Sequence, residues 1–260
     1  MDSAADFISI RGLSKTFGEG TTGEVVALRN VNCTIRAGDF VSVVGPSGCG
    51  KSTLLRILAG LIDASSGNVS MGGQAIRGTR RDIGVVFQNS ILLPWRTIID
   101  NVMLPAEVLG LERKAARQRA HDLLAMVGLA GFEDKLPSQL SGGMQQRASI
   151  ARALLHDPRI LLMDEPFGAL DAMTREQMNL ELQRIWSESG KTIVLITHSI
   201  PEAVFLGNVV FVMTPRPGRL DCTVPIELPR PRTMASMADP EFVARAQEIR
   251  ALFNAAGALH

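Results

Sequence analysis

The chain has 260 residues, 46% of them hydrophobic and 20% charged, and its lysines and arginines (27) almost equal its aspartates and glutamates (26). This is the composition of a globular protein with room for one large domain, or for a core with an inserted subdomain. A formal net charge of +1 argues against a dedicated nucleic-acid-binding protein, so no DNA or RNA partner is expected.

The cysteines and the chain start exclude two further classes. Cys33, Cys49 and Cys222 are scattered and form no CxxC pair, so neither a zinc site nor a disulfide framework is indicated, and a reduced cytosolic compartment is the default expectation. The opening residues MDSAADF are acidic and lack the apolar core of a signal peptide. No apolar run approaches the roughly 20 residues that span a bilayer, so any role at a membrane would need a partner.

The first third of the chain is strand-like. Residues 31–36 alternate between apolar and polar side chains, the period of a half-buried strand. Residues 40–44, FVSVV, are continuously apolar, as in a strand covered on both faces. Glycines follow at once, and KSTLLRILAG (51–60) predicts a helix that ends at Gly60.

The middle of the chain changes character. IGVVF (83–87) predicts another strand, whereas residues from about 90 to 156 are rich in Ala, Leu, Arg and Gln, with apolar residues near helical spacing. We interpret the latter as a helical subdomain inserted into an α/β core.

The last third alternates between strand and helix patterns, which implies a mainly parallel sheet. The predicted strands are ILLM (160–163), TIVLI (192–196) and VVFVM (209–213), with a helix over about 172–189. Repeated prolines then predict an irregular tail up to a short helix near 240–253.

GPSGCGKST (45–53) matches the phosphate-loop pattern GxxxxGK[ST], with a buried strand before it and a helix after it. Its glycines let backbone N–H groups converge on phosphate oxygens, so a chance glycine turn is the weaker interpretation. Lys51 is expected to reach the β- and γ-phosphates, Ser52 to bind Mg²⁺ and Thr53 to touch the α-phosphate. Cys49 is either a redox switch or a small residue that fits. The residues expected to bind the nucleotide are Gly45, Pro46, Ser47, Gly48, Cys49, Gly50, Lys51, Ser52 and Thr53.

ILLMDEP (160–166) ends an apolar strand in two carboxylates. Strand side chains alternate, so Asp164 and Glu165 point differently. We assign Asp164 to Mg²⁺ and Glu165 to the general base that activates the attacking water, with a solvated turn as the alternative.

Four further residues are candidates for the nucleotide site. Gln88 and His198 follow predicted parallel strands, at the sheet edge where α/β proteins bind ligands. Gln88 could bind Mg²⁺ and position water, and His198 could bond the γ-phosphate and steady Glu165. Asp171 either caps the helix from Ala172 or serves the site, and Phe17 either stacks on adenine or belongs to the core.

From Phe7 to about Val224, the chain resembles the nucleotide-binding subunit of an ABC transporter. The resemblance rests on six motifs, which occur in the order GPSGCGKST, VVFQ, LSGGMQQR, ILLMDEP, GALD and ITH. LSGGMQQR (140–147) is the diagnostic motif. The resemblance implies a phosphate-loop NTPase core with a mainly parallel sheet, an N-terminal antiparallel β subdomain and an inserted helical subdomain. The expected ATP-binding core is 1–88 with 157–226, the helical subdomain is 89–156 and the tail is 227–260.

The resemblance also implies a Mg²⁺-dependent ATPase that works as a head-to-tail homodimer. Ser141, Gly142 and Gly143 of one subunit would contact the γ-phosphate held by the other, because a hydroxyl, amide N–H groups and a helix N-terminus favour an anion. The expected partners are two integral-membrane permease subunits and, indirectly, an extracytoplasmic solute-binding protein. The subunit would lie peripherally on the cytoplasmic side of the cell membrane.

Two positions depart from the family's pattern. Phe17 stands where many members have Tyr, and Gly168 stands where many have Ser. Each departure removes a side-chain hydroxyl group, and neither changes the predicted fold.

The motif LLPWRTxxDNV and the tail resemble those of importer ATPases for nitrate, sulfonate, taurine and related small solutes. Importers of pyrimidine or other vitamin precursors share this motif. Trp95 and Leu92–Leu93 are candidates for a permease-docking surface, or Trp95 is a core residue. Two different functions compete with import: a soluble ABC-type ATPase that acts on ribosomes or DNA, and a non-hydrolytic regulatory module.

Overall fold

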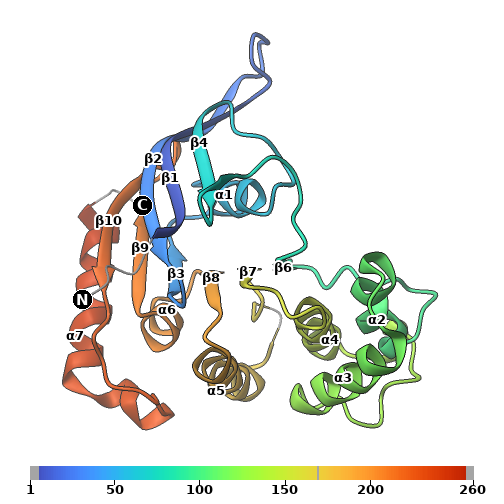
Figure 1. The fold of residues 1–260 in the computed structure, drawn as a ribbon. Coiled ribbons are helices and arrows are strands. Elements are labelled where there is room, and N and C mark those ends of the chain that lie inside the picture. Colours follow the sequence, from blue (N-terminus) through green and yellow to red (C-terminus); the bar gives the residue numbers. More distant parts are fainter. Residues whose placement is uncertain (1–5, 169, 256–260) are drawn as a thin grey trace. The chain divides into compact units, whose positions relative to one another are not determined.

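The structure is a computed structural model that describes residues 6–168 and 170–255. The chain forms two compact units (Figure 1). Unit 1 comprises Met1–Arg80 and Ile185–His260, and unit 2 comprises Arg81–Arg184. Helix α5 (Ala172–Ser189) carries the chain from unit 2 back into unit 1.

Unit 1 begins with an antiparallel sheet in the order β2-β1-β4-β5. Its strands are β1 (Asp6–Phe17), β2 (Val25–Arg36), β4 (Ser66–Met71) and β5 (Gln74–Ala75). The predicted alternation over 31–36 is observed, because Val31 and Ile35 are buried while the residues between them are exposed or half-buried. The strand is longer than predicted, since β2 begins at Val25.

The second group of strands in unit 1 is centred on β3 (Phe40–Val44). β3 pairs in parallel with β8 (Thr192–Ile196) on one side and with β9 (Val209–Met213) on the other. All residues of β3 and β8 are buried, as the continuous apolar runs predict. β10 (Leu220–Pro225) adds to β9 in antiparallel orientation.

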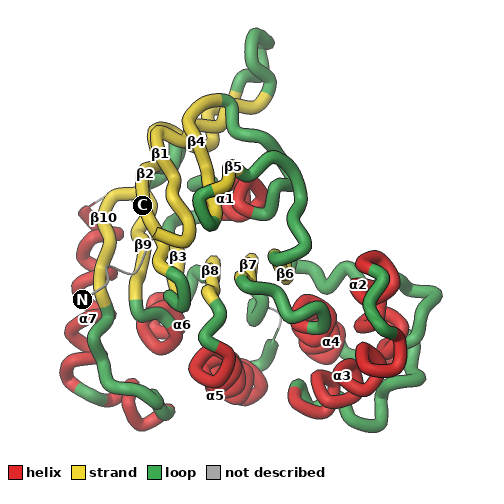
Figure 2. Tube along the Cα trace, in the orientation of Figure 1, coloured by secondary structure: helices red, strands yellow, loops and turns green. Residues whose placement is uncertain are grey.

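The helices of unit 1 connect and cover these strands. α1 (Lys51–Leu58) follows β3, and α6 (Ile200–Leu206) follows β8 and packs on β3. The short helix η2 (Met234–Ala238) leads into α7 (Pro240–Ala255), which packs against α6 and β9. Figure 2 shows a loop between β10 and η2.

Unit 2 contains a parallel strand pair and a group of helices. β6 (Ile83–Val86) pairs with β7 (Ile160–Asp164). The helices are α2 (Ile98–Leu109), α3 (Arg113–Met126), the short η1 (Pro137–Gln139) and α4 (Gly142–Leu154). The three α-helices pack against one another, and α4 also packs on β6. The helical character predicted for about 90–156 is therefore observed.

The structure corrects the prediction in two places. The segment after residue 213 is not irregular throughout, because Leu220–Pro225 forms β10. Prolines tolerated at strand ends and edges do not exclude a strand there, which is why the pattern was misleading. Helix α6 was missed because it has only seven residues, too few to show a helical period.

The predicted domain boundaries at 88/89, 156/157 and 226/227 remain predictions. No helix within the described part of the chain is long and apolar enough to cross a membrane.

Candidate functional site

The phosphate loop joins β3 to α1 in unit 1. Gly50 precedes the helix with φ 101°, and a Cβ there would lie 2.8 Å from the carbonyl oxygen of Ala27. Only glycine meets both conditions without strain. Ser52 and Thr53 lie in the first turn of α1, where backbone N–H groups have no acceptor within the helix. This arrangement favours an anion such as a phosphate.

Lys51 is turned toward its own loop. Its Nζ donates to the carbonyl oxygens of Gly45 at 2.7 Å and Pro46 at 3.1 Å, and the residue is buried. Its third contact is to Cys49 Sγ at 4.0 Å, a weak acceptor that a phosphate oxygen can replace. Cys49 is fully buried, and burial raises the pKa of its thiol. A protonated thiol is a poor nucleophile, which favours the interpretation of Cys49 as a small residue that fits.

Phe17 lies at the end of β1 with 42% of its surface exposed. The Nζ of Lys15 is 5.2 Å from the centre of its ring. Lys15 pairs with Leu28 across the β1–β2 register, and a Cβ on Gly50 would come within 2.7 Å of Leu28 Cδ2. The exposed ring therefore belongs to the strand pair that packs against the phosphate loop, and the interpretation of Phe17 as a core residue is wrong.

His198 and the phosphate loop follow neighbouring strand ends. Val43 of β3 pairs with Ile196 of β8, and the N–H of Thr197 donates to the carbonyl oxygen of Val43. The phosphate loop starts after Val44, so the loop and His198 lie at the same edge of the sheet. The imidazole is exposed. Unit 1 thus carries all three features, with the loop and His198 at the same edge of the sheet and the Phe17 ring on a strand paired with β2.

Unit 2 holds the two predicted carboxylates at the end of β7. Asp164 is buried, while Glu165 is half-buried and has a φ of 45°. A left-handed conformation is costly for a residue other than glycine, and such strain is often found at functional positions. Gln88 follows the neighbouring strand β6, and its Nε2 donates to Oε2 of Glu165 at 3.3 Å. The structure therefore brings Gln88 and Glu165 together.

The second glycine turn, Ser141-Gly142-Gly143, starts α4. Ser141 is the N-cap, and its Oγ accepts from the N–H of Met144 at 3.3 Å. Capping uses an oxygen lone pair, so the hydroxyl proton stays able to donate. The N–H groups of Gly142 and Gly143 have no acceptor within the helix. Because Gly142 is exposed, with no heavy atom within 4 Å of the place a Cβ would occupy, an anion can approach this turn.

Asp171 caps α5. Its Oδ1 accepts from the N–H of Thr174 at 2.9 Å and its Oδ2 from Thr174 Oγ1 at 2.7 Å, and these bonds lower the pKa of the carboxyl. The capping interpretation is thus confirmed, and a role toward the nucleotide stays a prediction. Gly168 is exposed, and its neighbour Ala169 of the GALD motif lies outside the described residues.

Side chains of α4 hold the segment that follows β6. Gln146, which is buried, donates to the carbonyl oxygen of Phe87 at 2.8 Å. The guanidinium of Arg152 donates to the carbonyl oxygens of Ser90 at 3.0 Å and Ile91 at 2.8 Å. Ile91 is 58% exposed and has a φ of 41°, an unfavourable conformation for a β-branched residue. These bonds to both carbonyls stabilise the bend.

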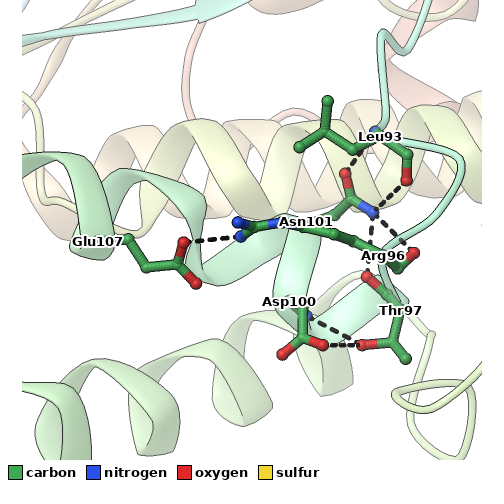
Figure 3. Close-up of polar contacts among 6 residues, drawn as sticks. All are labelled: Leu93, Arg96, Thr97, Asp100, Asn101 and Glu107. Carbon is green, nitrogen blue, oxygen red and sulfur yellow. Dashed lines mark hydrogen bonds and ion pairs between the residues drawn. The ribbon is translucent and has the colours of Figure 1, made fainter.

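Asn101 of α2 holds the next part of the same segment (Figure 3). Its Oδ1 accepts from the N–H of Leu93 at 2.7 Å, and its Nδ2 donates to the carbonyl oxygens of Leu93, Arg96 and Thr97 at 3.0–3.1 Å. Asn101 is fully buried. One amide side chain therefore fixes the loop 93–97 in a single conformation.

Trp95 is the outward-pointing residue of that loop, with 73% of its surface exposed. Its alternative interpretation as a core residue is therefore wrong. Leu92 and Leu93 are half-buried. Arg96 beside Trp95 forms a 2.7 Å ion pair with Glu107 of α2, also visible in Figure 3. The loop thus presents an aromatic ring on a rigid base.

Sequence reasoning missed three of these residues, Gln146, Arg152 and Asn101. Each bonds backbone carbonyls, which leave no pattern in the sequence. The one usable signal was that Asn101 and Gln146 occupy buried faces of their helices, where a polar residue needs partners.

A strand–loop–helix phosphate site, a strand that ends in two carboxylates and a second glycine turn at a helix N-terminus together define a phosphate-loop ATPase of the ATP-binding-cassette class. The ABC transporter family matches residues 28–168, more than half of the chain. The chain belongs to this family, and it is an ATP-binding ATPase.

Individual relatives agree with this assignment. An aliphatic sulfonates import ATP-binding protein from Bacillus licheniformis is 46% identical over 229 residues, which cover 88% of this chain and 88% of the relative. A taurine import ATP-binding protein from Rhizobium johnstonii is 46% identical over 235 residues, covering 88% and 90%. A solved structure described as a dimeric post-hydrolysis state of the ATP-binding cassette MJ0796 bound to ADP and Pi matches with a TM-score of 0.78 at 35% identity, covering 85% of this chain and 99% of that chain.

Proposed function

We propose that this chain drives the import of a small organosulfur solute, such as a sulfonate or taurine, by binding and hydrolysing ATP on the cytoplasmic side of the cell membrane. The relatives named as sulfonate and taurine import ATP-binding proteins carry this proposal, because they match at 46% identity over 88% of the chain. Two permease subunits would supply the pathway, and an extracytoplasmic binding protein would supply the solute.

Within one subunit, we assign the residues of the loop 45–53 to the phosphates, with Lys51 at the β- and γ-phosphates and the Phe17 ring under the adenine. Glu165 takes the proton of the attacking water as general base. Its contact with Gln88 supports a joint role, since an amide 3.3 Å from the carboxylate can hold the same water. His198 donates to the γ-phosphate, and Asp171 supports the site from the start of α5.

Mg²⁺ would be held by the hydroxyl of Ser52, the amide oxygen of Gln88 and the carboxylate of Asp164. All three are oxygen ligands, as Mg²⁺ prefers. The described residues contain no group of three His, Cys, Asp or Glu side chains that could hold a metal. Mg²⁺ is commonly bound through one or two carboxylates together with phosphates of the substrate. When bound, the ion neutralises charge on the β- and γ-phosphate oxygens.

We propose that the functional unit is a head-to-tail homodimer. Ser141, Gly142 and Gly143 of one subunit contact the γ-phosphate bound by the partner subunit. The exposed N-terminus of α4 supports this, because its donors are free to meet an anion from outside. Closure then depends on ATP, because only the closed state gains these γ-phosphate contacts.

We propose that Trp95, with Leu92 and Leu93, docks on a permease subunit. Interface centres are enriched in aromatic residues, and an anchor held in advance by Asn101 loses little conformational freedom on binding. The bonds from Arg152 and Gln146 connect the same segment to α4, the helix that starts with the second glycine turn. A nucleotide-dependent movement of α4 would therefore reach the docking surface directly.

Growth and purification experiments test the proposed function. In the organism that carries the chain, deletion should abolish growth on taurine or an alkanesulfonate as sole sulfur source, and the wild-type chain should restore it, whereas Glu165→Gln should not. The tagged chain should copurify with two membrane subunits. If the wild-type chain restored growth only on nitrate or only on a vitamin precursor, that solute would replace the organosulfur class in the proposal. Copurification with ribosomes or DNA, and not with membrane subunits, would overturn the import function.

A further inference from the structure

The turn that carries His198 is held from inside unit 1. Thr197 Oγ1 donates to a carboxylate oxygen of Glu202 and accepts from the N–H of Ser199 at 3.0 Å. Ser199 Oγ accepts from the N–H of Glu202 at 3.3 Å and caps α6. Thr197 and Glu202 are buried, whereas His198 is exposed. The orientation of His198 therefore depends on how α6 is seated.

The opposite end of α6 is held by an arginine of the C-terminal tail. Arg232 Nη1 donates to the carbonyl oxygens of Val204 at 2.7 Å, Phe205 at 3.0 Å and Gly207 at 2.7 Å. The carbonyls of the last helical turn have no partner within a helix. A cation that bonds them also lies favourably in the field of the helix C-terminus.

Arg230 completes this contact. Its Nη2 donates to the carbonyl oxygen of Leu206 at 2.5 Å, and its guanidinium lies 4.2 Å from the centre of the Trp186 ring. Trp186 Nε1 in turn donates to the carbonyl oxygen of Gly38 at 2.8 Å, just before β3. The tail thus ties the end of α6 to the central strand of unit 1.

Arg232 also forms hydrogen bonds within the tail, because its Nη2 donates to the carbonyl oxygens of Ile226 at 3.3 Å and Leu228 at 3.2 Å. Only 1% of its surface is exposed, and burial lowers its pKa to about 10, so the guanidinium stays charged at neutral pH. Burying a charge is costly unless it is well bonded, and five backbone carbonyls meet that need here.

We propose that Arg232 and Arg230 are positioning residues for His198, so that the C-terminal tail takes part in ATP hydrolysis through α6. With seven residues, α6 is only about 10 Å long, and it packs directly on β3 and α7. If its C-terminal carbonyls lost their donors, the helix could tilt about the Thr197–Glu202 contact. A displacement of about 1 Å at a catalytic group can cost on the order of 100-fold in rate. The inference rests on the proposed contact of His198 with the γ-phosphate.

A kinetic double-mutant cycle between Arg232 and His198 tests the proposal in the full chain. Arg232→Lys keeps the charge but replaces a planar fork of donors by a single nitrogen. In the wild-type background it should lower kcat about 10-fold, with less than about a 3-fold change in KM for ATP. In the His198→Ala background the same substitution should cost nothing further, since no imidazole remains to be positioned.

Arg245→Met is the matched control, because Arg245 lies in the same tail but pairs with Glu248 on α7 at 2.8 Å. It should leave kcat unchanged in both backgrounds. If Arg232→Lys does not fold, as judged by thermal unfolding, Arg230→Met carries the same cycle with the same expected pattern.

Two results would overturn the inference, and they lead to different conclusions about His198. Equal losses of kcat from the arginine substitution with and without His198 would show an effect on general stability, and the proposed role of His198 would stand. A normal kcat for His198→Ala would refute that role itself, and the positioning role would fall with it.

Discussion

Replacing Asn101 by leucine should free the loop that presents Trp95. The substitution keeps the branched shape and the number of heavy atoms of the side chain but removes four hydrogen bonds, to one N–H and three carbonyl oxygens. Each buried hydrogen bond contributes about 1 kcal/mol net, and an amide left without a partner costs about 1–3 kcal/mol. Three of the four bonds share the two protons of Nδ2, so we expect a loss of about 3 kcal/mol in the free energy of unfolding.

Urea unfolding and fluorescence measure the two consequences separately. The chain has two tryptophans, so a Trp186→Phe background leaves Trp95 as the only emitter. Time-resolved anisotropy of Trp95 should show a new nanosecond motion after Asn101→Leu. Gln118→Ala, which removes an exposed bond to Asp122, is the control and should change neither quantity. A loss below about 1 kcal/mol with an unchanged anisotropy decay would show that Asn101 does not hold the loop.

Three more predictions concern the nucleotide site and one helix cap. Glu165→Gln should keep ATP binding and slow hydrolysis by about 10²–10⁴-fold in a phosphate-release assay, and near-normal turnover would exclude the base assignment. Ser141→Arg should block ATP-driven dimerisation in analytical ultracentrifugation while a monomer still binds ATP, and loss of monomer binding would contradict a contact in trans. Bonds from the N–H groups of Ala115 and Lys114 lower the pKa of Glu112 from 4.5. The ionised Glu112 carboxylate therefore stabilises the fold above pH 4.5, and this stabilisation is lost as the pH falls through the lower pKa of the folded state. The difference in Tm between the wild type and Glu112→Gln should vanish in acid. A difference in Tm that stays constant with pH would refute the prediction.

The elements that carry motifs were predictable because their patterns are local. FVSVV at 40–44 and TIVLI at 192–196 are continuous apolar runs, and both form fully buried strands. Gly50 was predictable as well, since its place before a helix requires a conformation that only glycine adopts easily.

The residues that hold these elements in place were not predictable. Asn101, Arg152 and Arg232 all donate to backbone carbonyls, and any residue type can supply a carbonyl. The choice of partner is decided by tertiary packing, which a single sequence does not display. Strand β10 was missed for a related reason, because its pairing with β9 outweighs the local signal of the prolines around it.

The position of β3 has a consequence for how the chain becomes active during synthesis. β3 leaves the ribosome early, yet both of its partners, β8 and β9, come from residues 192–213. A nascent chain that already contains the whole of GPSGCGKST therefore lacks the two strands that hold the loop's base. Contacts so distant in sequence also form slowly. Nucleotide binding should appear only when β9 has emerged, so truncated chains that carry the complete motif should not compete for ATP.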